Sequence, residues 1–547
     1  MKAFFATAIT FLLLFGCIAT APQQNQQPER QQTGQQQAPP FYQECATGMG
    51  CRGMMQEGMM GQQAGELEDY RPQTYGQLQQ TQDAPLADGA RFTLEAGIIK
   101  ATLFGQEQYL YGYNSQIPGP TLRVKQGSKI YVDFKNSIDQ PTTVHWHGLR
   151  LQNAFDGVPN VTQPEVQPGG SFTYELDFPD EGIYWYHPHV REEVQQERGL
   201  YGVIMVEPKE AGYFSEAGKE ETVVLDDVLL GRDGNLFPFG KNFTAFAIMG
   251  RFGNQPLING RESYSATVKT GEVLRLFFLN TANVRPFNIS IKGTQMKMVG
   301  ADSGKFEREF FADSFAIAPS ERYIAEVAFE KPGKYGLYNI NPFSSYKLGE
   351  IIVEGEPAAL PESFLSLRNN MEISESIDPY RAYFDAPPDF DYELNVDIPG
   401  AMMGMGMMME HTEDGIEWED TMFGMNAIST SENLEWRIID KKTGKWNMDA
   451  SATVPVGNPF KIRLTNTGAE DSLHPMQHPI HLHGARFLVL SKDGVKNSNL
   501  AWEDTVLVPT GSTVEILTYF PNPGEWMLHC HVAEHLSSGM MTSIRAV

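Results

Sequence analysis

The stretch HCHVAEHLSSGM at residues 529–540 brings histidine, cysteine and methionine together at short spacing. Residues two apart on a β-strand share a face, so His529 and His531 point one way and Cys530 points the other. Two imidazoles, one thiolate and a weak thioether form the ligand set of a blue copper electron-transfer site. The stretch therefore predicts a copper bound through Cys530, with two further imidazoles directly behind the thiolate.

A second histidine-rich stretch, HPIHLHG at residues 478–484, supplies partners for both faces. If this stretch is extended, His481 and His483 share a face and His478 points the other way. His478 can therefore join the thiolate, while the other two rings join the pair at 529 and 531. The blue copper ligands predicted in this way are His478, Cys530, His535 and Met540.

Two more His-x-His pairs occur in the first third of the chain, HWHG at 145–148 and HPH at 187–189. With the pairs described above they give eight imidazoles, out of 12 His in the whole sequence. Imidazole also suits zinc, but a Cys, His and Met set suits copper and is rare in structural zinc sites. The constellation therefore predicts several coppers rather than scattered histidines.

As a set, these four motifs resemble those of the multicopper oxidases, the family that includes laccases, ascorbate oxidase and bacterial cuprous oxidases. The resemblance implies one type 1 copper, one type 2 copper and a coupled type 3 pair, which reduce O2 to water with electrons from an outside reductant. It assigns the type 1 copper to the four ligands predicted above. It assigns the type 2 copper to His145 and His481. The type 3 ligands that it implies are His147, His187, His189, His483, His529 and His531.

An internal repeat supports a three-part architecture. A Val-x-x-Gly pattern, followed at constant spacing by Asn, begins at Val124, Val268 and Val454. In the first and third copies a later Gly precedes a motif histidine, His187 or His529, whereas the middle copy has Tyr338 at that place. Copper ligands therefore come from the first and third copies, and the middle copy is expected to act as a spacer that folds them together.

Short strand-like stretches separated by Gly, Pro and Asn turns predict an all-β chain of three antiparallel β-sandwich domains. The family resemblance identifies them as Greek-key cupredoxin-type domains that follow a flexible N-terminal tether. The predicted domains cover residues 86–210, 211–358 and 378–547. The first and third carry copper ligands, and the second carries none.

The N-terminal residues are predicted to be a targeting segment and a tether. Residues 1–16 hold a Lys and an apolar run, which is typical of the signal peptide of an exported, extracytoplasmic protein. The run ends in a sequence resembling a lipoprotein box, so Cys17 is a candidate lipid anchor on the outer face of the cell membrane; the alternative is an ordinary signal peptide. Residues 17–85 are predicted as a Gln- and Met-rich tether. Within it, Cys45 and Cys51 form a disulfide or bind a soft metal with neighbouring Met.

Reduction of O2 to water also consumes protons, and Asp156 is the candidate to supply them. It matches an acidic position that follows HWHG in the family; the alternative is a turn residue before Gly157. Many relatives also have an acid directly after the last His of the C-terminal motif. This chain has Leu536 there, with Glu534 one place before the His.

The reductant is indicated by a Met-rich segment, because thioethers select Cu(I) and cuprous oxidases carry such an insertion over the blue site. The formal net charge of −26 attracts cations and argues against nucleic acid. The favoured reductant is Cu(I) or another metal ion, and the alternatives are a laccase-type oxidase of phenols and a non-enzymatic copper-sequestering protein. The candidate substrate-copper ligands are Met402, Met403, Met405, Met407, Met408, Met409, His474 and Met476.

Overall fold

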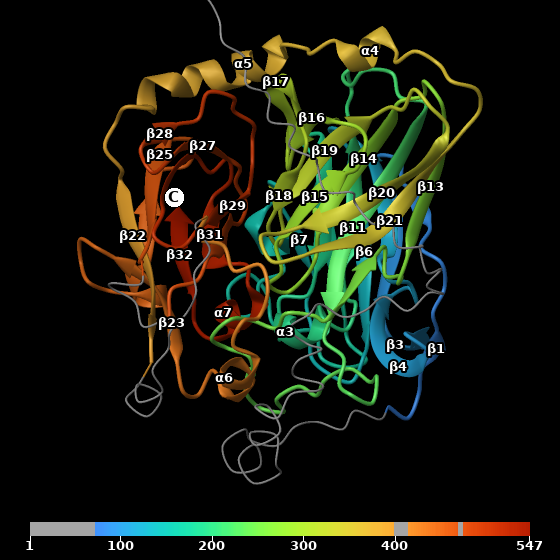
Figure 1. The fold of residues 1–547 in the computed structure, drawn as a ribbon. Helices are drawn as coiled ribbons and strands as arrows, with labels where there is room; N and C mark the ends of the chain where they lie inside the picture. Colours follow the sequence, from blue (N-terminus) through green and yellow to red (C-terminus); the bar gives the residue numbers. More distant parts are fainter. Residues whose placement is uncertain (1–71, 399–413, 469–473) are drawn as a thin grey trace, which may run out of the picture. The chain divides into compact units, whose positions relative to one another are not determined.

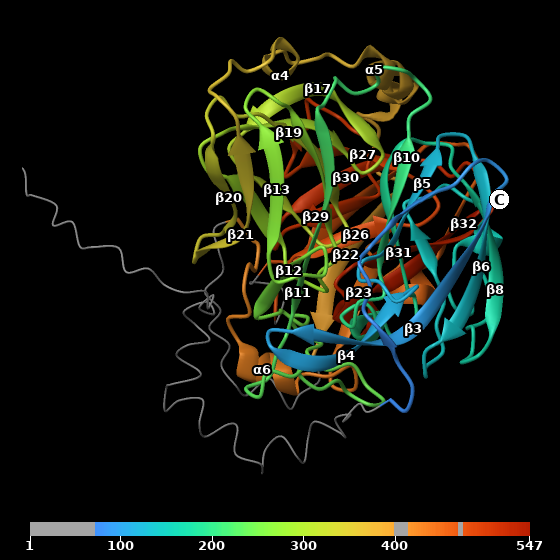
Figure 2. The same cartoon turned by 90° about the vertical axis from the view of Figure 1, so that its right-hand side faces the viewer.

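The computed structural model describes residues 72–398, 414–468 and 474–547. Within these residues the strands form six sheets, and the buried apolar side chains gather between two sheets at a time, in three main cores. The colours of Figures 1 and 2 separate the three sheet pairs: blue to teal, green to yellow, and orange to red. The predicted all-β fold with three cupredoxin-type sandwiches is confirmed.

Among the described residues, the first sandwich contains ten strands. Their bounds are β1 Gly76–Gln77, β2 Asp83–Pro85, β3 Arg91–Leu103, β4 Gln106–Tyr113, β5 Gly119–Lys125, β6 Lys129–Ser137, β7 His145–His147, β8 Ser171–Asp177, β9 Gly182–His187 and β10 Gly202–Glu207. One sheet has the order β1-β3-β6-β8 with β4 beside β3, and the other has the order β2-β5-β10-β9-β7. Alternate residues of β6, such as Ile130, Val132 and Phe134, are buried in the core, as the period of a strand requires.

The predicted end of the tether at residue 85 is wrong. Gly76–Gln77 and Asp83–Pro85 lie inside the predicted tether but form β1 and β2, which pair in parallel with β3 and β5. Both are short strands with exposed or half-buried side chains. A polar composition does not prevent such pairing, because an edge strand needs only backbone hydrogen bonds and leaves its side chains in solvent.

The second sandwich contains eleven strands among the described residues. Their bounds are β11 Lys219–Val228, β12 Gln255–Ile258, β13 Tyr264–Lys269, β14 Leu274–Asn280, β15 Phe287–Ile291, β16 Met296–Ala301, β17 Gly304–Ala312, β18 Phe315–Ile317, β19 Arg322–Val327, β20 Gly333–Ile340 and β21 Ser345–Glu354. The two sheets have the orders β12-β11-β14-β19-β16-β17 and β13-β21-β20-β15-β18.

The third sandwich follows a connection of short helices. The bounds of its strands are β22 Phe390–Asp397, β23 Glu435–Asp440, β24 Ala452–Val454, β25 Phe460–Asn466, β26 His478–Leu482, β27 Phe487–Lys492, β28 Val495–Lys496, β29 Thr505–Val508, β30 Thr513–Thr518, β31 Gly524–Cys530 and β32 Met541–Ala546. Its sheets have the orders β23-β22-β25-β30-β27-β28 and β24-β32-β31-β26-β29. The other predicted domain boundaries remain predictions.

The helices are short. Their bounds are α3 Glu192–Gln195, α4 Glu362–Leu365, α5 Met371–Ile377, α6 Phe423–Ile428 and α7 Ala533–Ser537, with short 3-10 helices at η1 Asn153–Phe155, η2 Asp378–Tyr383 and η3 Asn447–Ala450. The helices α3 and α7 come from the first and third sandwiches and lie in contact (Figure 1). Among the residues that the structure describes, no helix combines the length and the apolar character needed to cross a membrane.

Some neighbouring strands in the predicted antiparallel sandwiches run parallel. In each sandwich an early strand runs parallel to its neighbour, in the pairs β3 with β6, β11 with β14 and β22 with β25. Parallel neighbours need a crossover connection. Here the connection passes through the facing sheet of the same sandwich, because β5, β13 and β24 lie in that sheet between the paired strands in sequence.

Candidate metal centre

The ligand motifs occupy matching strands in the first and third sandwiches. In the first, β7 pairs with β9, so that His145 lies opposite His187. In the third, β26 pairs with β31, so that His481 lies opposite His529. The corresponding strands of the middle sandwich, β15 and β20, also pair, and they carry Phe287 and Tyr338 in place of motif histidines. Strand pairing therefore brings together residues far apart in sequence.

The predicted blue copper ligands lie together in the core of the third sandwich. Cys530 Sγ is 3.5 Å from Nδ1 of His478 and 3.6 Å from Nδ1 of His535, and all three residues are buried. Met540 is also buried, and its carbonyl oxygen accepts a hydrogen bond of 3.1 Å from the Cys530 amide. Burial raises the pKa of the Cys530 thiol, so a metal bound there has to displace its proton.

Trp436 of β23 packs against two of these ligand residues, and the sequence did not predict this contact. Its ring centroid lies 4.1 Å from that of His535 and 4.9 Å from that of His478. The indole Nε1 donates a hydrogen bond of 2.8 Å to the carbonyl oxygen of Ala247, which fixes the ring. No short-range pattern links a residue of β23 to the ligand motifs, so only the fold reveals the contact.

The eight paired imidazoles form a second buried cluster between the first and third sandwiches. Their ring nitrogens converge in three groups, each with ligand atoms within 4.8 Å of one another. The groups are His145 with His147 and His481, His147 with His187 and His531, and His189 with His483 and His529. Burial, together with the neighbouring imidazoles, lowers the pKa of His529 to about 4 and holds the pKa of His481 and of His531 well below the usual value, which keeps these rings neutral as metal ligands must be.

The hydrogen bonds of the rings show that the cluster fits a metal. In three rings Nδ1 lies within hydrogen-bonding distance of a backbone oxygen, and Nε2 has no hydrogen-bond partner among the described residues; the rings are His145, His187 and His481. His147 is reversed, because its Nε2 lies 3.0 Å from Asp504 Oδ1 and its Nδ1 has no partner in that part of the chain. A buried nitrogen without a hydrogen-bond partner destabilises the folded state. These unpartnered ring nitrogens, which face one another, are therefore suited to binding copper.

Asp156 lies against this cluster. Its backbone oxygen accepts a hydrogen bond of 2.7 Å from His145 Nδ1, and its Oδ2 accepts one of 2.8 Å from His483 Nδ1. The side chain is 1% exposed. Asp156 therefore orients two rings from different sandwiches. The predicted role in proton supply remains a prediction.

Two further acids touch the cluster and were missed in the sequence. Glu192, at the start of α3, places Oε1 3.2 Å from His189 Nδ1. Asp504, just before β29, contacts His147 through Oδ1, and its carbonyl oxygen accepts a hydrogen bond of 2.7 Å from His481 Nδ1. The one sequence feature that could have indicated these two residues is an acidic residue beside an otherwise apolar strand. That feature is too common in proteins to identify a site.

The remaining candidate residues are only partly described. His474 and Met476 are both buried. Burial of His478 lowers the pKa of its ring to about 3, and the charge of the nearby His474 contributes to this shift. Leu536 packs in a small apolar cluster, while Glu534 accepts a hydrogen bond of 3.2 Å from Asn283. The candidate ligands within residues 402–409, together with Cys17, Cys45 and Cys51, lie outside the described residues.

Comparison with known proteins identifies the family. Three family profiles described as multicopper oxidase match residues 97–211, 227–349 and 421–547. The multicopper oxidase MmcO of Mycobacterium tuberculosis is 28% identical over 465 residues, with 79% of this chain and 82% of that protein covered. Copper resistance protein A of Escherichia coli is 25% identical, with 84% and 92% covered. The crystal structure of a multi-copper oxidase from Pseudomonas thermotolerans is 26% identical with a TM-score of 0.62, covering 85% of this chain and all of that one.

The sandwiches, the buried ligand groups and these matches define a class of copper-dependent oxidoreductases that use O2 as electron acceptor. The chain belongs to the multicopper oxidases. It couples the one-electron oxidation of a reductant to the four-electron reduction of O2 to water, and copper is its cofactor.

Proposed function

We propose that the chain holds one type 1 copper, one type 2 copper and a type 3 copper pair. The type 1 ligands are His478, Cys530, His535 and Met540. The type 2 ligands are His145 and His481. The type 3 ligands are His147, His187, His189, His483, His529 and His531. The grouping of the ligand atoms supports this proposal, because the Cys530 group shares no residue with the three imidazole groups and all four groups are buried.

The observation that carries the proposal is the position of Cys530 between two imidazoles of the cluster. Cys530 Sγ lies in the blue group, whereas the rings of His529 and His531 lie in the other groups. Copper held by these residues would supply the one-electron redox chemistry needed for the four-electron reduction of O2. Cys530 and its two neighbours supply a path of covalent bonds between the two groups, and the surrounding apolar core keeps water out.

For the reductant we propose Cu(I). The support is the run of six Met at 402–409, the excess negative charge, and the burial of His474 and Met476, four and two residues before His478. Copper resistance protein A, a relative over most of the chain, is named for a copper-related role. A laccase-type reaction with phenols is the alternative, and membership of an oxidase family argues against simple sequestration of copper.

Deletion of residues 400–411 tests the choice between these reductants. We expect kcat/KM for Cu(I) to fall about tenfold, which corresponds to roughly 1.4 kcal/mol of lost binding. Oxidation of a phenol should stay unchanged or improve, because an organic reductant does not need thioether ligands. Steady-state O2 uptake with Cu(I), Fe(II) and a phenol, measured on one copper-loaded preparation, gives both numbers. An equal fall in both activities means that the segment is structural.

Asp156 is proposed to support the reduction of O2 by orienting His145 and His483 and by relaying protons. In Asp156→Asn we expect O2 to reoxidise the reduced enzyme about 10- to 100-fold more slowly, the usual cost of losing a group that holds a metal ligand. Anaerobic reduction of the blue copper should keep its rate. Stopped-flow absorption of the blue band measures both steps. A solvent deuterium effect that grows in the variant supports the proton role, and unchanged reoxidation rejects both roles.

The enzyme is further proposed to be exported and held at the outer face of the membrane by a lipid on Cys17. This rests on the sequence of residues 1–17 alone. Metabolic labelling with a fatty acid tests it, since label in the wild type but not in Cys17→Ala is expected. Unlabelled wild-type protein rejects the anchor.

A further inference from the structure

The middle sandwich, which carries none of the proposed copper ligands, reaches the imidazole cluster through one buried arginine. Arg322 begins β19 and is fully buried. Its Nη1 and Nη2 donate hydrogen bonds to Oδ1 and Oδ2 of Asp504, each 2.5 Å long. Such a two-pronged contact holds a carboxylate in position and in plane, which a lysine cannot do.

Asp504, which Arg322 holds in place, in turn contacts two imidazoles. The oxygen Oδ1 that Arg322 holds also lies 3.0 Å from His147 Nε2, and Thr505 Oγ1 lies 3.1 Å from the same nitrogen. The Asp504 carbonyl oxygen accepts from His481 Nδ1 at 2.7 Å. Because Nε2 of His147 is occupied by these oxygens, Nδ1 is the atom left to face the cluster. The carboxylate therefore sets which nitrogen this ring presents.

Arg322 is itself fixed by groups from the first and middle sandwiches. Its Nε donates a hydrogen bond of 2.9 Å to the carbonyl oxygen of Ile183 in β9. Asp302 accepts from the backbone amide of Arg322 at 2.8 Å and from that of Asp504 at 2.9 Å, so one carboxylate aligns both partners. The contact thus joins all three sandwiches at a single buried point.

The HWHG motif leaves space for this contact. A Cβ atom on Gly148 would lie 2.4 Å from Asp504 Oδ2 and 2.9 Å from Arg322 Nη2, closer than real atoms approach. Gly148 also has a φ of 86°, which a side chain disfavours. The last residue of the motif therefore has a physical reason to be glycine: the ion pair fills the place of its side chain.

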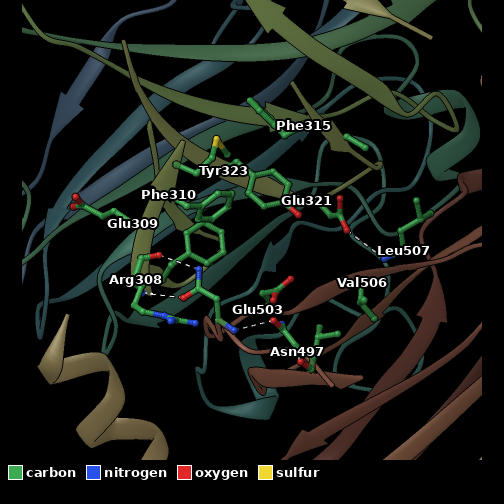
Figure 3. Close-up of a pocket in the computed structure, with 15 residues that line it drawn as sticks. Arg308, Glu309, Phe310, Phe315, Glu321, Tyr323, Asn497, Glu503, Val506 and Leu507 are labelled. Atoms are coloured by element: carbon green, nitrogen blue, oxygen red, sulfur yellow. Dashed lines mark hydrogen bonds between the residues drawn. The ribbon is translucent and has the colours of Figure 1, made fainter. Parts of the chain in front are cut away.

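A cavity of about 700 Å³ lies next to this contact. Figure 3 shows Glu321 and Glu503, the chain neighbours of Arg322 and Asp504, at its wall, together with Phe310 and Tyr323. Burial raises the pKa of Glu321 to about 7. Each pair of neighbouring residues thus turns one side chain to the cavity and the other to the ion pair, as adjacent residues of extended chain do.

We propose that Arg322 is a positioning residue of the copper cluster: by holding both oxygens of Asp504 it fixes the ring of His147 with Nδ1 toward the metals. This inference rests on the proposed function. It gives the middle sandwich a direct part in the site, beyond that of a spacer.

The test compares Arg322→Gln with a matched control in the same sheet. Arg275 of β14, the strand next to β19, is equally buried and contacts Glu326 at 2.6 Å, but its carboxylate partners belong to the middle sandwich. We expect Arg322→Gln to lose copper from the cluster, to shift the electron paramagnetic resonance signal of the type 2 copper, and to reduce O2 about 10- to 100-fold more slowly. Its blue absorption band should be unchanged. Arg275→Gln should unfold at a lower temperature while keeping both copper signals, and Arg322→Lys should recover part of the type 2 signal.

Several outcomes overturn the inference. A normal type 2 signal and normal copper content in Arg322→Gln would do so, and so would equal damage to both signals in Arg275→Gln, which marks a purely structural role. If Arg322→Gln does not fold, as judged by absence of the blue band, Asp504→Asn decides, because it keeps the shape of the carboxylate but loses the charge. A normal cluster in that variant rejects the inference. A wild-type protein without a type 2 signal rejects the proposed function itself, and the inference with it.

Discussion

Replacing Cys530 with serine is expected to remove the blue absorption band and to abolish steady-state O2 uptake. The band arises from charge transfer between a thiolate and Cu(II), and a hydroxyl cannot replace it. Serine is close to cysteine in size, so the core around the buried Sγ should remain packed. Copper in the imidazole cluster should be retained, because none of its rings is changed. Absorption spectra, copper content and O2 uptake on the same preparation measure all three.

Met540 offers a matched control for that experiment. In a blue copper site the axial thioether is a weak and distant ligand that tunes the redox potential. Met540→Leu keeps the volume of the buried side chain and should therefore stay blue, with a changed potential. If Cys530→Ser remains blue and active, Cys530 is not the thiolate ligand and the proposed type 1 site is wrong.

The repeat in the sequence predicted three sandwiches because its residues perform the same task in each. The repeated asparagine uses its side-chain amide to hold two backbone carbonyl groups: Asn136 binds those of Gln140 and Val166, and Asn466 binds those of Met476 and Val508. The repeated glycine has a φ between 73° and 82° at Gly127, Gly271 and Gly457. A positive φ is strained for a residue with a side chain, so the turn at this place in each domain requires glycine.

The grouping of the histidines was also predictable, for a simple geometric reason. Side chains alternate between the two faces of a strand, so the spacing within HPIHLHG and HCH is enough to separate the rings into two sets. In the structure His478 lies with Cys530, and His481 lies with the imidazole cluster. Whether two side chains of a strand share a face depends only on whether their spacing is even or odd, so this prediction does not require knowledge of which strands pair.

Residues that act through the fold were not predictable. Asp504 and Arg322 are 182 positions apart in sequence, and neither belongs to a motif. Trp436 reaches the blue group from a strand of the facing sheet. Likewise, the parallel strand pairs depend on how the chain crosses between sheets, which alternation of polar and apolar residues does not encode.

His531 occupies the place where the covalent path from Cys530 meets rings of the first sandwich. Its ring centroid lies 5.0 Å from that of His147 and 5.0 Å from that of His187, and the residue is 1% exposed. Its ligand atom groups with those two rings within 4.8 Å. Loss of this imidazole therefore removes one member of a group that joins two domains.

His531→Gln is expected to lower the rate of O2 reduction by about 100-fold or more, the upper end of the cost of disturbing a metal site. Reduction of O2 to water needs four electrons at one place, so an incomplete cluster fails even when the blue copper is intact. Under anaerobic conditions the blue band should still bleach when a reductant is added, and it should fail to return when O2 is admitted. His147→Gln should behave in the same way. Tyr338→Phe, at the matching place in the middle sandwich, should leave both steps unchanged. Normal O2 uptake in either histidine variant, at normal copper content, would contradict a cluster in which the paired imidazoles act as one unit.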